Sequence, residues 1–209
     1  MTEAAMQTLA ILRDTAHFQP YIILYIPFLL YVYTVEIEKK AWDNVLLGLI
    51  FSAAVFLPEF VNGLILHFTQ YAGLWMTPKS SAFVIMIGVN IEITLMFCTA
   101  GIIFAKLLSM DKNVAILGIP NRIFIPLAMG VFCIIVEVIL NRFGLLVWEY
   151  KYWSWPHVEF ILIAYTAPFF LAVWVHDNMR LKSKAVLFFS LLAVNVILWV
   201  IFVHLLKWM

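Results

Sequence analysis

Long apolar stretches recur along the whole chain, and they constrain its fold more than any other feature. Each is close to the roughly 20 apolar residues that cross the hydrocarbon core of a bilayer as a helix. A helix suits that setting because it closes its backbone hydrogen bonds internally, where no water is available. The pattern predicts an all-α integral membrane protein with a six-helix transmembrane bundle. The predicted spans cover approximately residues 18–35, 44–66, 82–105, 122–147, 157–176 and 185–206.

The composition agrees with that class and leaves little room for a soluble domain. Hydrophobic residues make up 65% of the 209 residues and charged residues 12%, against roughly 45–50% and 25% in soluble proteins. We therefore predict one polytopic membrane domain over residues 1–209, in contact with the lipid bilayer. The formal net charge is only +1, so we expect no nucleic acid partner, since such binding needs a basic surface. Monomeric and oligomeric assemblies are both compatible with the sequence.

The distribution of basic residues predicts the orientation, because cytoplasmic loops carry an excess of Lys and Arg. Eight of the 13 basic residues fall in the loops after the first, third and fifth predicted spans, and five fall on the opposite side. We therefore place both termini on the non-cytoplasmic side of the membrane. The eight residues are Lys39, Lys40, Lys106, Lys112, Arg122, Arg180, Lys182 and Lys184.

Acidic side chains inside or beside the predicted spans are the main functional signal. Glu59, Glu92 and Glu137 lie within apolar segments, and Glu159 begins the fifth span. A charged side chain at the bilayer centre costs at least ~2.5–3.5 kcal/mol, so an acid there favours a functional interpretation. On the predicted orientation all four acids lie in the outer half of the membrane. We predict that they are catalytic residues of one shared polar chamber.

Amide and aromatic side chains near these acids are the predicted substrate-binding residues. Asn62 follows Glu59 by three positions and Asn141 follows Glu137 by four, so each pair shares a helical face. For a single amide, a hydrogen bond between helices is the alternative role. For a single aromatic residue, the alternative is an anchoring belt at the membrane surface. The predicted binding residues are Asn62, Asn90, Asn141, Trp148, Tyr150 and Trp153.

A carboxyl group surrounded by hydrocarbon resists ionisation and can donate its proton as a general acid. This suits proton-initiated cyclisation, isomerisation or hydration of a lipid-soluble, isoprenoid-like substrate, with aromatic faces stabilising a carbocation. Two alternatives stay open: a small proton- or cation-coupled transporter that uses Glu92 and Glu137, or an accessory subunit of a membrane complex. The chain has no HExxH motif and no glycine-rich phosphate loop, so we predict neither a metal nor a cofactor.

An internal repeat is suggested when the sequence is shifted by 78 positions. The shift superposes Glu59 on Glu137 and Trp75 on Trp153. Each copy would form a helical hairpin in the same orientation, as in membrane proteins built from parallel repeats. Few of the positions between these residues match, so coincidence is the favoured interpretation.

Two short motifs, Trp-x-Tyr and Pro-x-x-Glu, precede and open the fifth predicted span. The residues that form them are Trp148, Tyr150, Pro156 and Glu159. They resemble the Trp-x-Tyr and Pro-x-Glu-Glu-x-x-Phe motifs of the lycopene cyclase domain family, small polytopic membrane enzymes, although Val158 occupies the position of the first Glu. The acid-bearing spans and aromatic loops are also similar to those of small membrane-bound terpene cyclases. The resemblance implies proton-initiated isoprenoid chemistry, with Glu59, Glu137 and Glu159 as candidate acids.

Overall fold

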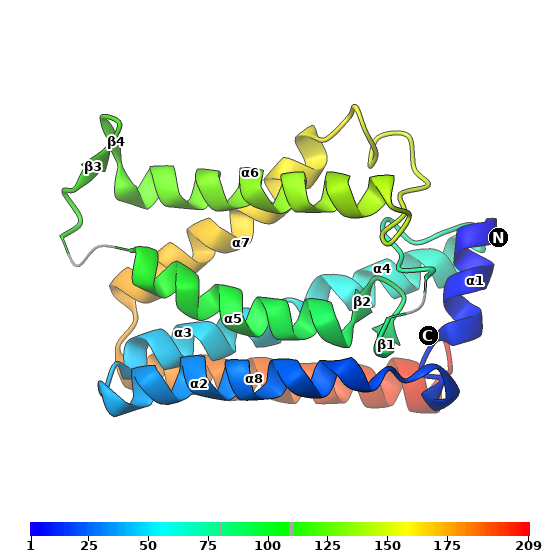
Figure 1. Ribbon diagram of the computed structural model, residues 1–209, viewed down its shortest axis with the longest axis horizontal. Coiled ribbons are helices and arrows are strands. Elements are labelled where there is room, and N and C mark those ends of the chain that lie inside the picture. The colour runs from blue at the N-terminus through cyan, green and yellow to red at the C-terminus, as the bar shows by residue number, and fades with distance from the viewer. Residues whose placement is uncertain (80, 109–110) are drawn as a thin grey trace.

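The computed structural model describes residues 1–79, 81–108 and 111–209, and its long helices run side by side along one axis (Figure 1). The helices are α1 (Glu3–Ile11), α2 (Tyr25–Glu38), α3 (Trp42–Ala54), α4 (Phe56–Thr69), α5 (Ile91–Leu107), α6 (Asn121–Arg142), α7 (Glu159–Asn178) and α8 (Leu181–Trp199). The strands are β1 (Val84–Met86), β2 (Val89–Asn90), β3 (Ala115–Ile116) and β4 (Ile119–Pro120). Short 3-10 helices, Thr15–His17 and Pro20–Leu24, precede α2, and a π-helical stretch, Val200–Leu205, continues α8.

Within the described residues, five helical segments are long and apolar enough to cross a membrane. They are Pro20–Glu38, Trp42–Thr69, Asn121–Arg142, Glu159–Asn178 and Leu181–Leu205. Each corresponds to one predicted span, and the all-α membrane bundle is confirmed. α3 and α4 together form one of them, with only Val55 between the two helices. Both chain termini lie at the same end of the bundle (Figure 1), and the side of the membrane that this end faces stays a prediction.

The third predicted span, 82–105, was wrong in its first part. β1 and β2 form an antiparallel hairpin there, and α5 begins only at Ile91. The helix starts at this point because the Asn90 side-chain oxygen accepts a hydrogen bond from the Ile93 backbone N–H at 2.9 Å, which caps the free N-terminal turn. The fourth predicted span also ends earlier than expected, because α6 stops at Arg142.

The β1–β2 hairpin is enclosed by protein, since Val84, Met86, Ile87 and Val89 are each at most 3% exposed. Non-helical backbone is tolerated at membrane depth where protein surrounds it in this way. α5 has 17 residues, so it is about 25 Å long and falls short of the ~30 Å hydrocarbon core. The hairpin extends this element at the end of the bundle where the chain termini lie (Figure 1).

Helix α3 lies at the centre of the bundle and packs against α5, α7 and α8. Its Phe51 stacks on Phe169 of α7 with the ring centroids 5.1 Å apart, and Phe104 of α5 packs on the same ring at 4.9 Å. α6 packs mainly against α7. Helix α7 therefore joins α6 to the rest of the bundle, and this packing directs Glu137 of α6 into the protein.

Candidate functional site

Two of the four predicted acids, Glu59 and Glu137, come together inside the protein. Glu59 lies in the first turn of α4, and Glu137 lies in the C-terminal part of α6. The two residues are 4% and 8% exposed, and their carboxyl groups are near enough to interact electrostatically. Both belong to segments that can cross the membrane. The pair therefore forms a polar centre within an otherwise apolar region.

The Glu59 carboxyl group is held by a tryptophan from the loop that follows α4. Trp75 Nε1 donates a hydrogen bond to Glu59 Oε1 at 2.5 Å. Asn62, one turn after Glu59, fixes that loop, because its side chain accepts from the Leu74 N–H and donates to the Trp75 carbonyl, both at 2.7 Å. Gly88, between β1 and β2, leaves room for the indole, since a Cβ there would lie 2.3 Å from Trp75 Nε1. Asn62 and Gly88 thus position Trp75 against the acid.

The Glu137 carboxyl group is held by a tyrosine from the neighbouring helix. The Tyr165 hydroxyl of α7 donates a hydrogen bond to Glu137 Oε1, and the Trp148 indole borders the same carboxyl group. Tyr165 also lies within electrostatic reach of Glu59. Glu59, Glu137 and Tyr165 therefore form one cluster, which we call the acid cluster, contributed by α4, α6 and α7.

Tryptophan side chains surround the acid cluster. Trp75 and Trp153 stack with their ring centroids 5.6 Å apart, and both pack with Trp148 and Tyr165. Three buried polar atoms here have no hydrogen-bond partner among the described residues: Glu59 Oε2, Trp148 Nε1 and Trp153 Nε1. Buried polar atoms normally have partners. Trp148 still borders the Glu137 carboxyl group, and Gly88 borders the Glu59 carboxyl group, so Trp153 Nε1 is the clearest place for water or a polar group of a ligand.

A cavity of about 80 Å³ reaches the acid cluster from between α5 and α6. Apolar side chains line most of it, and Glu137, Tyr165 and Cys133 are the lining residues that carry polar groups. Met96 of α5 and Phe132 of α6 also line it, and they are 40% and 58% exposed. Phe132 belongs to a segment that can cross the membrane, so its exposed side chain faces lipid and the cavity lies close to the bilayer.

The other two predicted acids lie outside the acid cluster. Glu92 begins α5 and accepts hydrogen bonds from the Tyr21 hydroxyl and from the Ala82 backbone N–H, the latter at 2.6 Å. Glu159 begins α7, its side chain is 59% exposed, and its Oε1 lies 3.4 Å from His157 Nδ1. Both acids occupy the first turn of a helix, where the helix dipole favours negative charge. The structure thus does not bring all four acids into one chamber.

Like Asn62, three further predicted binding residues make hydrogen bonds with the backbone. Asn90 caps α5, as described above. Asn141 donates from Nδ2 to the Leu146 carbonyl at 3.0 Å, and the Tyr150 hydroxyl donates to the Ala72 carbonyl at 3.0 Å. The last two bonds hold the loops that carry the tryptophans of the acid cluster. Asn141 and Tyr150 therefore help to position the tryptophans around the acid cluster by holding these loops.

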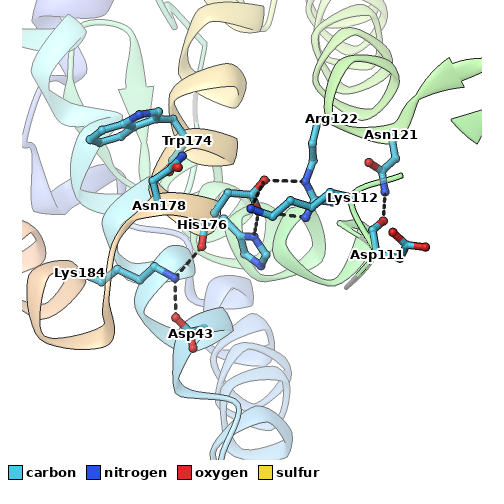
Figure 2. A network of polar contacts seen from close by, with 10 residues as sticks. Asp43, Asp111, Lys112, Asn121, Arg122, Trp174, His176, Asn178 and Lys184 are labelled. Carbon is cyan, nitrogen blue, oxygen red and sulfur yellow. Dashed lines mark hydrogen bonds and ion pairs between the residues drawn. The ribbon is translucent and has the colours of Figure 1, made fainter. Parts of the chain in front are cut away.

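A second polar cluster lies at the opposite end of the bundle from the chain termini, and Figure 2 shows its contacts. Arg122, near the start of α6, makes two hydrogen bonds of 2.9 Å with the Asp177 carboxylate near the end of α7. His176 Nδ1 lies 2.8 Å and Lys112 Nζ 3.5 Å from the same carboxylate. We call this group of side chains the ionic cluster.

Lys184, in the first turn of α8, extends the ionic cluster to α3. It is only 1% exposed, and its ammonium group donates to Asp43 at 2.5 Å and to the His176 carbonyl at 3.1 Å (Figure 2). Arg122 of α6 thus pairs with Asp177 of α7, and Lys184 of α8 pairs with Asp43 of α3. The ionic cluster therefore joins the ends of α3, α6, α7 and α8. We interpret its role as stabilising the packing of these helices.

The sequence-based prediction did not include Tyr165. The sequence offered one signal, a tyrosine inside an apolar span. A buried hydroxyl group requires a hydrogen-bond partner, and an acid in a neighbouring span can accept that bond. Among the described residues, no group of three or more His, Cys, Asp or Glu side chains is arranged to hold a metal ion.

The chain is similar to known proteins over nearly its whole length. Residues 2–204 match a family described as an uncharacterized membrane protein family. The chain belongs to this family. A relative from Archaeoglobus fulgidus, described as an uncharacterized protein, is 40% identical over 208 residues, which are 99% of each chain. No solved structure matches the chain. Neither match supports the resemblance to lycopene cyclase domains, whereas the family agrees with the membrane location.

Proposed function

We propose that the chain is an integral membrane enzyme that protonates a carbon–carbon double bond of a lipid-soluble, isoprenoid-like substrate. The observation that carries the proposal is the Glu137–Tyr165 pair, which lies in an apolar cavity between α5 and α6. A carboxyl group in apolar surroundings favours its neutral form, which is the form that a general acid requires. The apolar lining of the cavity suits an alkene.

In the proposed step, the Glu137 carboxyl gives its proton to one carbon of the double bond, whose π electrons form the new C–H bond. The other carbon becomes a carbocation, which the aromatic side chains that line the cavity, such as Phe97 and Phe169, stabilise. Glu137 becomes a carboxylate, and the hydrogen bond from Tyr165 stabilises that charge. In this proposal the Glu59 carboxylate accepts a proton lost from a neighbouring carbon, which completes an isomerisation or cyclisation. Addition of water to the cation gives hydration instead.

The resemblance of residues 148–160 to lycopene cyclase domains supports the same class of chemistry. Within that stretch, Trp148 borders the Glu137 carboxyl group and Trp153 stacks on Trp75. Glu159 of the resembling motif lies at the exposed start of α7. The proposed step therefore uses Glu137 and Glu59, and it uses neither Glu159 nor Glu92.

The two alternative functions have less support. Coupled transport needs water to reach the acids from alternate sides of the membrane, whereas the cavity at Glu137 is lined mainly by apolar side chains. An accessory subunit would direct its acids outward to partner helices. Glu59 and Glu137 are instead 4% and 8% exposed, which favours a site inside this chain.

Native purification followed by mass spectrometry of the co-purifying lipids tests the proposal. The wild type is compared with Glu137→Gln and Glu59→Gln, which keep the side-chain shape but cannot act as acid or base. Glu38→Gln, at the exposed end of α2, is the matched control. We expect an unconverted terpenoid with the two site variants and its product with the wild type and the control. Identical lipids in all four proteins would contradict the proposal, and proton-coupled flux into liposomes, lost in the site variants, would favour transport.

A further inference from the structure

A second, larger hollow lies on a different part of the bundle. It is a groove of about 380 Å³ bounded by α3, α4, α5 and α8, and it includes no residue of the acid cluster. Most of its lining is aliphatic or aromatic. Leu192 and Val196 of α8 line it and are 44% and 54% exposed. Because these exposed residues belong to a segment that can cross the membrane, the groove faces lipid and its occupant is an apolar molecule.

One side chain in this groove has an unsatisfied polar atom. Asn195 of α8 donates from Nδ2 to the Ala53 carbonyl at 2.7 Å, which fixes the orientation of its amide. The Asn195 side-chain oxygen is buried and accepts no hydrogen bond from any described residue. Asn195 lies in the middle part of the apolar segment Leu181–Leu205. No bulk water is available at that depth to provide a donor.

The other polar groups of the groove do not provide that donor either. Ser52 Oγ donates to the Gly48 carbonyl at 2.7 Å, and Thr94 Oγ1 donates to the Asn90 carbonyl at 3.0 Å. The protons of both hydroxyl groups are thus used within their own helices. The Cys98 thiol, which also lines the groove, is only a weak donor. The groove therefore presents an acceptor and matches a ligand that carries a hydrogen-bond donor.

We propose that this groove binds an apolar lipid that carries a hydroxyl group, such as an isoprenoid alcohol, and that Asn195 Oδ1 accepts a hydrogen bond from that hydroxyl. The bond satisfies both partners, since a hydroxyl and an amide oxygen are each unfavourable in hydrocarbon without one. A ketone, an ether or a plain hydrocarbon has no proton to donate and is discriminated against. The site does not depend on the reaction proposed for Glu137.

Competition binding tests this site on the purified full-length chain in phosphatidylcholine nanodiscs. Tritiated geranylgeraniol is the probe, and the competitors are unlabelled geranylgeraniol and its methyl ether, which keeps the chain and the oxygen but lacks the donor. We expect the ether to compete about three- to tenfold more weakly, the range that one hydrogen bond inside a membrane protein supplies. Equal competition by the alcohol and the ether would overturn the proposal.

A matched pair of variants locates the recognition. Asn195→Leu is expected to remove the preference for the alcohol over the ether. Asn178→Leu is the control, because Asn178 is an exposed amide outside the groove with a similar bond, 2.9 Å long, to the Trp174 carbonyl, and it is expected to keep the preference. A preserved preference in Asn195→Leu would overturn the proposal.

Photolabelling gives a second measurement that needs only the wild type. Geranylgeraniol with a diazirine in its chain is bound and irradiated, and the labelled peptides are identified by mass spectrometry. We expect adducts on the parts of α5 and α8 that line the groove, close to Cys98 and Leu192. Adducts confined to other helices would overturn the proposal.

Discussion

The Tyr165 hydroxyl of α7 donates a hydrogen bond to the Glu137 carboxyl group of α6, so the proposed acid depends on the packing of two neighbouring helices. That packing is tight at Gly130, about two turns before Glu137. A Cβ on Gly130 would lie 2.3 Å from Thr166 Cγ2 of α7. The absence of a side chain at Gly130 therefore allows α6 and α7 to approach each other about one to two turns from the acid and its hydrogen-bond donor.

Gly130→Leu is expected to lower stability and lipid conversion together. The new side chain forces α6 away from α7, and such overpacking costs about 1–3 kcal/mol. Thermal unfolding in detergent and the lipid assay measure the two effects. Gly118→Asn is the control, because a Cβ at Gly118 meets no atom within 4 Å and Asn tolerates its positive φ. A wild-type melting temperature in Gly130→Leu would contradict the described helix contact.

Trp75→Phe and Trp153→Phe separate hydrogen bonding from stacking. Each variant keeps an aromatic ring in the Trp75–Trp153 stack, but only Trp75 donates to Glu59. Trp75→Phe removes the indole hydrogen bond to Glu59 Oε1, and the loss of a hydrogen bond to a buried group costs about 1–3 kcal/mol. We expect slower conversion in Trp75→Phe and near-normal conversion in Trp153→Phe. Equal losses in the two variants would show that the stack, rather than the hydrogen bond, matters.

The Arg122–Asp177 pair is expected to stabilise the fold through two hydrogen bonds. The side chains are 14% and 9% exposed, so Arg122→Ala leaves a nearly buried carboxylate with weaker partners and is expected to cost about 3 kcal/mol. Arg122→Lys is expected to recover little, because a lysine cannot make the two-point contact. Lys112→Ala is the control, since Lys112 is 56% exposed and surface pairs contribute little. Chemical unfolding measures all three, and similar losses in each would contradict this account.

Asn90→Ala tests whether Asn90 caps a helix or binds substrate. As the N-cap of α5, it is expected to contribute about 1 kcal/mol of stability. Asn90→Asp keeps the cap and is expected to retain that stability. If the role is capping alone, conversion per folded molecule is unchanged in both variants. A large loss of conversion in the stable Asn90→Asp protein would instead favour substrate binding.

The short turn Thr15–His17 is expected to resist acid. The Ala16 backbone N–H, at 2.8 Å, and the His17 ring, at 2.9 Å, both donate to the Asp14 carboxylate, and these bonds lower the pKa of Asp14 below its ordinary value. The stabilisation is therefore present above the ordinary pKa and is lost as the pH falls through the lowered one. Hydrogen exchange of the Ala16 amide measures it. Faster exchange already near the ordinary aspartate pKa would contradict the prediction.

Most of the membrane bundle could be predicted from the apolar stretches alone, because crossing a bilayer constrains both length and composition. The β1–β2 hairpin could not be predicted in this way. Residues 84–90 form a short, mostly apolar run, and such a run does not distinguish a buried strand from a membrane-spanning helix. Gly88 and Asn90 were the local signals, yet their meaning depends on Trp75, which packs against Gly88 from a loop elsewhere in the chain.

For the candidate site, the sequence predicted which acids are unusual but not which of them meet. Glu59 and Glu137 converge, whereas Glu92 and Glu159 lie at helix starts with other partners. The repeat shows the same limit. Its two tryptophans stack on each other, but Glu59 pairs with a tryptophan and Glu137 with a tyrosine. Such pairings depend on how the helices pack against each other. The spacing of residues within one helix does not predict that packing.

Incorporation of solvent deuterium into lipid tests the proposed proton transfer most directly. Membranes containing the wild type, Glu137→Gln or Glu38→Gln are incubated in D₂O, and the extracted lipids are analysed by mass spectrometry for stable carbon–deuterium bonds. The proposal predicts a deuterated terpenoid product with the wild type and Glu38→Gln, and none with Glu137→Gln. The same deuterated product in undiminished amount with Glu137→Gln would contradict the assignment of Glu137 as the acid.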